Sequence, residues 1–218
     1  ETIRKKSDVE YKYKKQSGGH GQYGHVKMTF EPSGDMDTPY VFEQTVVGGA
    51  VPKNFFPAVE KGIAESVKKG PLAAYPVTGI KAVLYDGSYH PVDSSEMAFK
   101  VATQQAFKKG IMEAKPVLLE PIATLKVVVP EGYTGDVMGE LNKRRARVMG
   151  MNPTDNGYQE IVADIPYLEL YGYNATLRSM TSGSGTFSYE FARYEQAPDD
   201  VAAKQIEERA SKLVEVEE

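Results

Sequence analysis

The residues best suited to chemistry in this sequence gather in two short stretches that lie far apart along the chain. Written in order, they are Ser17, Gly18, Gly19, His20, Gly21, Gln22 and Tyr23, followed much later by Gly87, Ser88, Tyr89, His90, Pro91, Val92 and Asp93. Together they offer imidazole, hydroxyl, amide and carboxylate groups, aromatic faces, and glycines that permit close approach to the backbone. Such groups suit either a catalytic site or a binding site for RNA.

The catalytic interpretation is the weaker of the two. A hydrolase-like set could be drawn from His20, His25, His90, Asp93, Ser94 and Ser95. However, Asp93 stands where a helix cap is needed, and the chain has no Gly-x-Ser-x-Gly turn. The histidines also lack the spacing of metal ligands. We therefore predict no catalytic residue, no metal site and no cofactor site in this chain.

The glycines of the first stretch raise the question of a nucleotide site. A phosphate-binding loop needs a Gly-Lys-Ser/Thr sequence and leads into a helix, whereas residues 17–24 lead into a strand pattern. A nucleotide site is therefore not expected. The plain alternative, a flexible turn, stays open because glycine first of all permits positive φ.

RNA binding requires cations near the phosphates, glycines for close approach, and planar groups that stack on bases. Both stretches meet this requirement, although the ring of Tyr89 could equally be packed beneath its loop. A second candidate RNA contact lies late in the chain, at a polar helix end and turn formed by Arg178, Ser179, Thr181, Ser182, Gly183 and Ser184.

Regular elements flank the first two stretches and would turn them into loop tips. Alternation at Val9, Tyr11 and Tyr13, and again at residues 26–30, predicts two strands joined by the glycine-rich stretch. The apolar residues 77–85 predict a strand before the second stretch, and Asp93 as N-cap predicts a helix from Ser94 to about Lys109.

The remaining pattern predicts an α+β protein of two domains. A helix over residues 54–70 completes the first domain, and the proline-bracketed stretch 116–121 ends it. From Ile122 the order is strand, helix, strand, strand, helix, strand, which is the ferredoxin-like split arrangement. We place the domains at residues 1–119 and 120–195, and a C-terminal helix at 196–218.

Composition favours a globular protein without a membrane segment. The chain is 41% hydrophobic and 26% charged, has no cysteine, and contains no apolar run of about 18 residues. These features, with no secretion signal, fit the cytosol. The net charge of -4 would disfavour RNA, but basic residues cluster locally, near the start and at Lys143, Arg144, Arg145 and Arg147. Either cluster alone could be a solvated face.

Six sequence motifs together resemble the C-terminal part of bacterial elongation factor G, the translocation GTPase. They occur in family order and cover nearly the whole chain: SGGHGQYGHV, VGGAVPKNFFPAVEKGI, LYDGSYHPVDSSEMAFK, KPVLLEPI, GDVMGELNKRR and GYNATLRSMTSGSGTFSYEF. The resemblance implies domain IV over residues 1–119, with a left-handed strand–helix–strand crossover. It further implies a ferredoxin-like domain V, and a terminal helix that packs back on domain IV.

The resemblance also implies a function. The two stretches at residues 17–23 and 87–93 would form the end of domain IV that enters the decoding centre and contacts messenger RNA and transfer RNA. Residues 178–184 would dock on ribosomal RNA of the large subunit. The expected partners are the ribosome's RNA and proteins, the chain would act as a monomer, and GTP with magnesium would bind in a GTPase domain outside this sequence.

Two positions depart from the family pattern and keep other functions open. The family usually carries arginine where this chain has His20, and arginine or a similar base at Ser184. These departures could mark a paralogue used in ribosome recycling or in slower translocation. A third possibility is a ribosomal protection protein, which shares the architecture but lacks the GSYHPVDSSE stretch.

Overall fold

The computed structural model describes residues 1–214, and these residues form two compact units. Unit 1 contains Glu1–Leu118 together with the C-terminal segment that begins at Ala197, and unit 2 is Leu119–Gln196. The part of the predicted C-terminal segment at residues 215–218 lies outside the described residues. Each unit has its own hydrophobic core and is described separately below.

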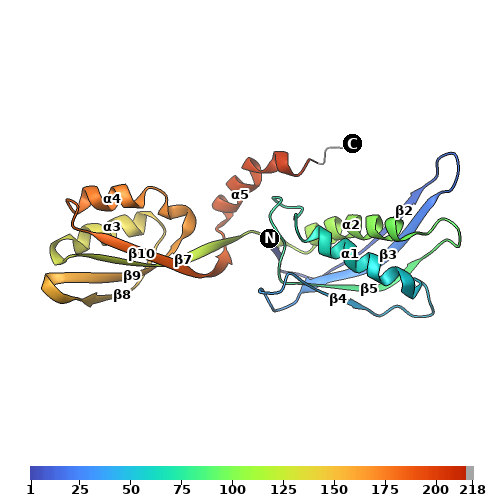
Figure 1. Ribbon diagram of the computed structural model, residues 1–218, viewed down its shortest axis with the longest axis horizontal. Helices are drawn as coiled ribbons and strands as arrows, with labels where there is room; N and C mark the ends of the chain where they lie inside the picture. Colours follow the sequence, from blue (N-terminus) through green and yellow to red (C-terminus); the bar gives the residue numbers. More distant parts are fainter. Residues whose placement is uncertain (215–218) are drawn as a thin grey trace. The chain divides into compact units, whose positions relative to one another are not determined.

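Unit 1 is built on a mixed four-stranded sheet with the order β2-β3-β5-β4 (Figure 1). Neighbouring strands are antiparallel except β4, which pairs parallel to β5. The strands are β2 (Ser7–Lys15), β3 (Gln22–Pro32), β4 (Tyr40–Gln44) and β5 (Ile80–Ser88). A parallel pair needs a crossover, and here it runs through a helix between β4 and β5. The handedness expected for this crossover stays a prediction.

Two helices cover one face of this sheet, α1 (Phe56–Ser66, preceded by a 3-10 turn at Lys53–Phe55) and α2 (Glu96–Glu113). Strand alternation sends Val26, Met28 and Phe30 toward the helices, and all three are fully buried. Phe30 meets the ring of Phe107 edge-on, with the ring centroids 5.8 Å apart. Burial of each such side chain contributes about 1.5–3 kcal/mol.

The start and the end of α2 differ from the prediction. Ser95, not Asp93, is the N-cap, and its hydroxyl oxygen accepts a hydrogen bond of 3.1 Å from the Ala98 amide. The assignment of Asp93 as cap was wrong because its carboxylate binds a distant segment instead. The helix also continues past Gly110 to Glu113, since the missing side chain of Gly110 leaves room for the Phe30 ring.

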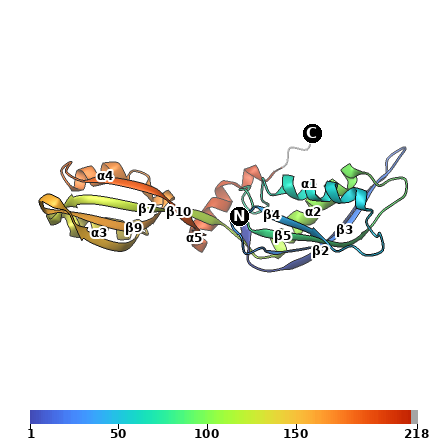
Figure 2. The same ribbon diagram turned by 60° about the horizontal axis from the view of Figure 1, so that its bottom comes forward.

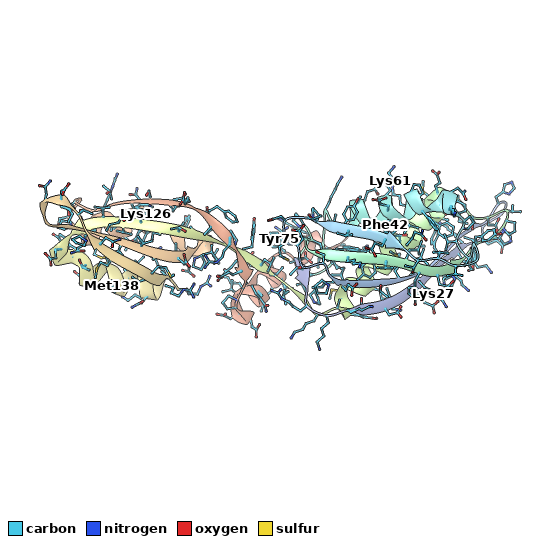
Figure 3. All side chains as sticks on the ribbon, turned by 90° about the horizontal axis from the view of Figure 1, so that it is seen from below. Lys27, Phe42, Lys61, Tyr75, Lys126 and Met138 are labelled. Carbon is cyan, nitrogen blue, oxygen red and sulfur yellow. The ribbon has the colours of Figure 1, made fainter. Side chains whose placement is uncertain are left out.

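The C-terminal helix α5 (Asp199–Glu208) packs on unit 1, as predicted, and a 3-10 turn at Ala210–Lys212 follows it. Its Ile206 packs against the small cluster of Ala73 and Leu118. Arg209 lies over the ring of Tyr75 at 3.6 Å and donates hydrogen bonds to the carbonyls of residues 73 and 74. Tyr75 is labelled in Figure 3. A two-residue pair, β1 (Thr2–Ile3) with β6 (Pro116–Val117), lies in the same unit.

Unit 2 confirms the predicted strand–helix–strand–strand–helix–strand order. Its antiparallel sheet has the order β10-β7-β9-β8. The elements are β7 (Leu119–Pro130), α3 (Thr134–Lys143, after a 3-10 turn at Glu131–Tyr133), β8 (Arg147–Pro153), β9 (Tyr158–Pro166), α4 (Tyr173–Met180, after a 3-10 turn at Tyr167–Leu170) and β10 (Thr186–Gln196). The hairpin between β8 and β9 turns at Asn156 and Gly157, which both have positive φ.

The late basic cluster of the sequence is largely neutralised within unit 2. Arg144 pairs with Glu140 at 2.9 Å, and Arg145 pairs with Glu120 at 2.8 Å. Arg147 pairs with Asp164 at 3.2 Å. The arginines therefore stabilise the fold, and the cluster is not a free basic surface. No helix within residues 1–214 has both the length and the apolar character needed to cross a membrane.

Candidate RNA-binding tip

The two stretches that could do chemistry meet at one end of unit 1. The hairpin between β2 and β3 and the loop between β5 and α2 extend from the same end of the sheet in both views (Figures 1 and 2). The amide of Tyr23 donates to the carbonyl of Asp93 at 2.9 Å, and the hydroxyl of Ser94 donates to the carbonyl of Tyr23 at 2.9 Å. The amide of Gly21 donates to the Asp93 carboxylate at 3.2 Å. We call residues 17–23 and 87–94 together the tip.

His90 is held in one orientation by its own loop. Its ring nitrogen Nδ1 accepts hydrogen bonds from the backbone amides of Val92 and Asp93, at 3.1 and 3.0 Å. Its backbone amide donates to the hydroxyl of Ser94 at 2.9 Å. Because Nδ1 is an acceptor, the neutral ring carries its hydrogen on Nε2. With 48% of the side chain exposed, His90 offers a fixed N–H donor to another molecule.

The second stretch begins inside a strand. β5 runs on to Ser88, beyond the predicted end at Tyr85, because Gly87 and Ser88 pair with residues 26 and 25 of β3. Beyond the strand, Tyr89 is 48% exposed and Val92 is 66% exposed. This settles the open question about Tyr89 in favour of an exposed ring. His90 and Pro91 are exposed as well.

The first stretch is open to solvent. Ser17, Gly18, Gly19 and His20 are exposed, and beyond their chain neighbours no described residue comes within 4 Å of a Cβ built on either glycine. Gly18 has a φ of +48°, which explains the need for glycine there. The carbonyl oxygen of the Gln22 side chain accepts from the Tyr13 hydroxyl at 2.8 Å, which leaves the Gln22 amide nitrogen to donate elsewhere.

Cations stand beside the tip on the edge strand β2. Lys14 and Lys15 pair in register with Tyr23 and Gln22, at the end of β2 nearest the hairpin, and both are exposed. Lys12 is exposed two residues earlier on the same strand. The tip therefore combines positive charge, exposed aromatic rings and bare glycine backbone, which are the components of a surface for non-helical RNA.

A hydrogen-bonded network lies at the base of the tip, and sequence reasoning missed it. The ring of buried His25 contacts the Glu10 carboxylate through Nε2 at 2.9 Å and the Ser88 hydroxyl through Nδ1 at 2.7 Å. The Ser88 hydroxyl also contacts the Tyr23 hydroxyl at 2.6 Å. The hydrogen bond to His25 lowers the pKa of Glu10, against a smaller opposing effect of burial. The sequence gives no indication of this role for Glu10, because strand register decides which residues lie next to it.

Carboxylate, imidazole and hydroxyl follow one another here in the order of a hydrolase triad. In such a triad the hydroxyl is free to attack a substrate. The Ser88 oxygen instead has hydrogen-bond partners on both sides, His25 and Tyr23. The geometry supports a network that holds three strands together.

The candidate site in unit 2 spans the last residues of α4 and the turn that follows them, and we call residues 178–184 the α4 turn. The amide of Gly183 donates to the carbonyl of Arg178 at 2.9 Å, and the hydroxyl of Ser184 donates to the carbonyl of Thr181 at 2.5 Å. Thr181 is buried, and its side chain supports the turn from within. The exposed members are Arg178, Ser179, Ser182 and Gly183.

The family models and a sequence relative both identify the family. Residues 1–115 match the family model described as elongation factor G, domain IV, and residues 117–205 match the model described as the elongation factor G C-terminus. An "Elongation factor G-like protein" from Thermotoga maritima is 50% identical over 217 residues, which are 100% of this chain and 32% of that protein.

A crystal structure from Thermus thermophilus is similar in fold as well as in sequence. It has a TM-score of 0.80 and 44% identity, and the match covers 96% of this chain and 31% of that one. This chain thus spans about a third of the length of both relatives. The matched regions are domains IV and V, which do not include a GTPase domain. The chain belongs to the elongation factor G family and comprises its domain IV and C-terminal domain.

Proposed function

We propose that this chain is the ribosome-binding part of a translational GTPase that promotes movement of transfer RNA and messenger RNA. One observation carries the proposal: two segments about seventy residues apart are hydrogen-bonded into a single tip that exposes His90, Tyr89 and bare glycine backbone. Family membership supports the same function. The tip would enter the decoding centre of the small subunit.

We infer that the tip acts by steric and electrostatic contact with RNA, which blocks its backward movement. The Nε2 hydrogen of His90 and the ring of Tyr89 contact messenger RNA and transfer RNA, while Lys14 and Lys15 approach the phosphates. The energy of this contact keeps the RNA from slipping back while the rest of the factor moves. The tip breaks no bond, and GTP and magnesium bind in a GTPase domain outside this chain.

The α4 turn supplies the second contact in this proposal. Its exposed Arg178, Ser179 and Ser182 would face ribosomal RNA of the large subunit, and the bare backbone of Gly183 allows close approach. The chain works as a monomer in the cytoplasm. The ribosome is its partner, including ribosomal proteins next to the RNA.

The proposal is tested by substituting His90 in the full-length factor. His90→Ala removes a donor that is fixed before binding, and loss of one such contact costs roughly 1–3 kcal/mol, about 5- to 150-fold in binding or rate. We expect translocation to slow by such a factor while ribosome-stimulated GTP hydrolysis stays nearly unchanged. Met112→Ala, a matched control, removes a side chain that is 49% exposed near the end of α2, and should change neither.

Salt dependence provides a second measurement on the chain as it stands. Contacts to phosphates release counterions, so co-sedimentation with ribosomes should weaken steeply between low and high salt. Ribosome binding that does not respond to salt would contradict an RNA contact.

The His90 variant has its own contradicting outcome. Equal loss of translocation and GTP hydrolysis in His90→Ala would contradict the assignment of the tip.

A paralogue of elongation factor G is the second candidate. His20 stands where the family usually has arginine, and the relative from Thermotoga maritima carries the name "Elongation factor G-like protein". A histidine in place of a permanently charged arginine would weaken the binding of the tip to RNA. His20→Arg should then speed translocation if the role is elongation, and leave recycling unaffected. The GSYHPVDSSE stretch argues against a ribosomal protection protein.

A further inference from the structure

Both ring nitrogens of His25 are engaged by partners on different strands. Nε2 lies 2.9 Å from the Glu10 carboxylate on β2, and Nδ1 lies 2.7 Å from the Ser88 hydroxyl on β5. His25 itself is on β3 and is 8% exposed, in register with Ser88. Strand alternation places it on the sheet face opposite to Val26 and the helices. This ring therefore joins the three strands that carry the tip.

The chemistry of the partners decides where the hydrogens lie. An ionised carboxylate can only accept, so Nε2 of His25 must carry a hydrogen toward Glu10. Nδ1 of the neutral ring is then an acceptor, and the Ser88 hydroxyl must donate to it. Having given its one hydrogen to His25, Ser88 can only accept from Tyr23, 2.6 Å away. The Tyr23 hydroxyl is thus left as the donor at the end of the chain.

We propose that His25 is a positioning residue that fixes the direction of this hydrogen-bond chain, so that Tyr23 presents oxygen lone pairs and no hydrogen at the tip. Tyr23 is half-buried, and its ring centroid lies 6.3 Å from that of His90. An oxygen without a free hydrogen selects hydrogen-bond donors and rejects acceptors. The tip would accordingly favour a ribose 2′-hydroxyl or a base amino group over a phosphate at this point, a consequence that rests on the proposed function.

The charged groups around the His25 ring favour the form in which Nε2 carries the hydrogen. Glu10 and Lys12 face it from β2, and Lys27 lies two residues along β3 on the same face (Figure 3). Asp86 on β5 pairs with Lys27 at 3.8 Å. The lowered pKa of Glu10 keeps its carboxylate ionised at neutral pH, as the direction of the chain requires. A ring protonated on both nitrogens would donate to Ser88 and reverse the direction.

Nuclear magnetic resonance of the whole chain at neutral pH tests the direction. We expect nitrogen shifts that place the His25 hydrogen on Nε2, and a Tyr23 hydroxyl hydrogen that exchanges slowly with water. Ser88→Ala should abolish the slow exchange, and Ser88→Thr should restore it because the hydroxyl returns. Tyr85→Phe is a matched control, because it removes a hydroxyl bonded to Asp8 at 2.6 Å, outside the chain, and should leave the Tyr23 signal unchanged.

A hydrogen on Nδ1 of His25 in the unmodified chain would overturn the proposal. So would a Tyr23 hydroxyl signal that persists in Ser88→Ala. These outcomes do not depend on ribosomes. A chain that shows the expected spectrum but does not bind ribosomes would therefore contradict the proposed function and leave the hydrogen-bond direction intact.

Ribosome affinity provides the functional measurement. His25→Gln keeps a polar side chain, but its amide can donate or accept, so the direction is no longer fixed. We expect His25→Gln and Tyr23→Phe each to weaken binding of the chain several-fold, and the double variant to be no weaker than Tyr23→Phe alone. Additive losses would show that His25 does not act through Tyr23 and would overturn its role.

Discussion

The tip of unit 1 and the α4 turn of unit 2 use the same polar residue types in different ways. At the tip, Asp93 and Ser94 bond to the hairpin some seventy residues away, and the side chain of His90 remains outside. At the α4 turn, Thr181 and Ser184 bond to residues within four positions of themselves. A local turn is built by its own sequence, whereas the tip exists only when unit 1 is folded.

The two regions should therefore respond differently to the loss of a hydrogen bond. A local turn ends a helix over a core, so a lost hydroxyl in it should affect the stability of the whole unit. The tip extends beyond the core of unit 1, so a lost contact there should loosen the tip and leave the unit folded.

The largest expected effect is on the α4 turn. The Thr181 hydroxyl donates to the Leu177 carbonyl at 2.7 Å and accepts from the Gly185 amide at 2.9 Å. Thr181→Val keeps the shape and leaves the Gly185 amide without its acceptor, while the Leu177 carbonyl still accepts from the backbone amide of residue 181 at 3.0 Å. We therefore expect the free energy of unfolding of unit 2 to fall by about 1–3 kcal/mol. Denaturant unfolding measures it. Ser182→Ala, at an exposed neighbour, should stay within about 0.5 kcal/mol, and an equal loss there would break the comparison.

A smaller and local effect is expected at the tip. Asp93→Ala removes the acceptor of the Gly21 amide, which should cost about 1 kcal/mol at a site whose carboxylate side chain is 25% exposed. Amide exchange at Gly21 should therefore speed up roughly fivefold, while the unfolding midpoint of unit 1 hardly moves. Asp93→Asn retains an acceptor oxygen and should exchange almost normally. A large shift of the midpoint in Asp93→Ala would mean that the tip is not separable from the core.

Two tyrosine hydroxyls extend the comparison. That of Tyr23 is hydrogen-bonded at the base of the tip, whereas that of Tyr173 is buried in unit 2 without a partner among the described residues. Burial raises the pKa of Tyr173 to about 12, with smaller opposing and supporting effects of Arg144 and Glu140. In the unfolded chain the Tyr173 hydroxyl ionises near pH 10, whereas in the folded unit it stays neutral up to about pH 12. The free energy of unfolding is therefore unaffected by ionisation of this group below about pH 10 and falls as the pH rises toward 12.

Tyr173→Phe removes both the unpaired hydroxyl and the titration. We expect the free energy of unfolding of unit 2 to rise by about 1 kcal/mol at neutral pH. Its decline between roughly pH 10 and 12 should also become shallower. Thermal unfolding followed across pH measures both changes. Destabilisation at neutral pH would indicate that the hydroxyl has a partner after all.

The smallest expected effect concerns charge. Among the described residues Lys14 and Lys15 beside the tip have no ion-pair partner, whereas Asp164 in unit 2 binds Arg193 at 2.7 Å and also Arg147. Burial raises the pKa of Asp164, but its bonds to the two arginines outweigh burial and lower it. Its stabilising contribution is present above the unfolded pKa of about 3.9 and is lost as the pH falls through the lower folded value. Asp164→Asn should reduce the acid dependence of unit 2 slightly, as unfolding against pH would show.

The sequence predicted much of the fold because both units follow simple periodicities. The β7–α3–β8–β9–α4–β10 order of unit 2 and the exposed His90 of unit 1 were both predicted. The N-cap was not, because Asp93 and Ser95 are equally good caps by residue type, and only the hairpin's demand for an acceptor decides between them. The burial of Thr181 was not predicted for a similar reason, since burial cannot be read from a polar residue in a turn.

By itself the sequence determined the alternation of strands, the α+β class, the family, and the two polar stretches that meet at the tip. Tertiary structure alone decided that Gly21 binds Asp93, that His25 lies between Glu10 and Ser88, and that Arg145 pairs with Glu120. Periodicity and capping act between neighbours along the chain, so residue order encodes them directly. Register and long-range hydrogen bonds arise only when whole strands pair, because they depend on which residues the shared core brings opposite one another.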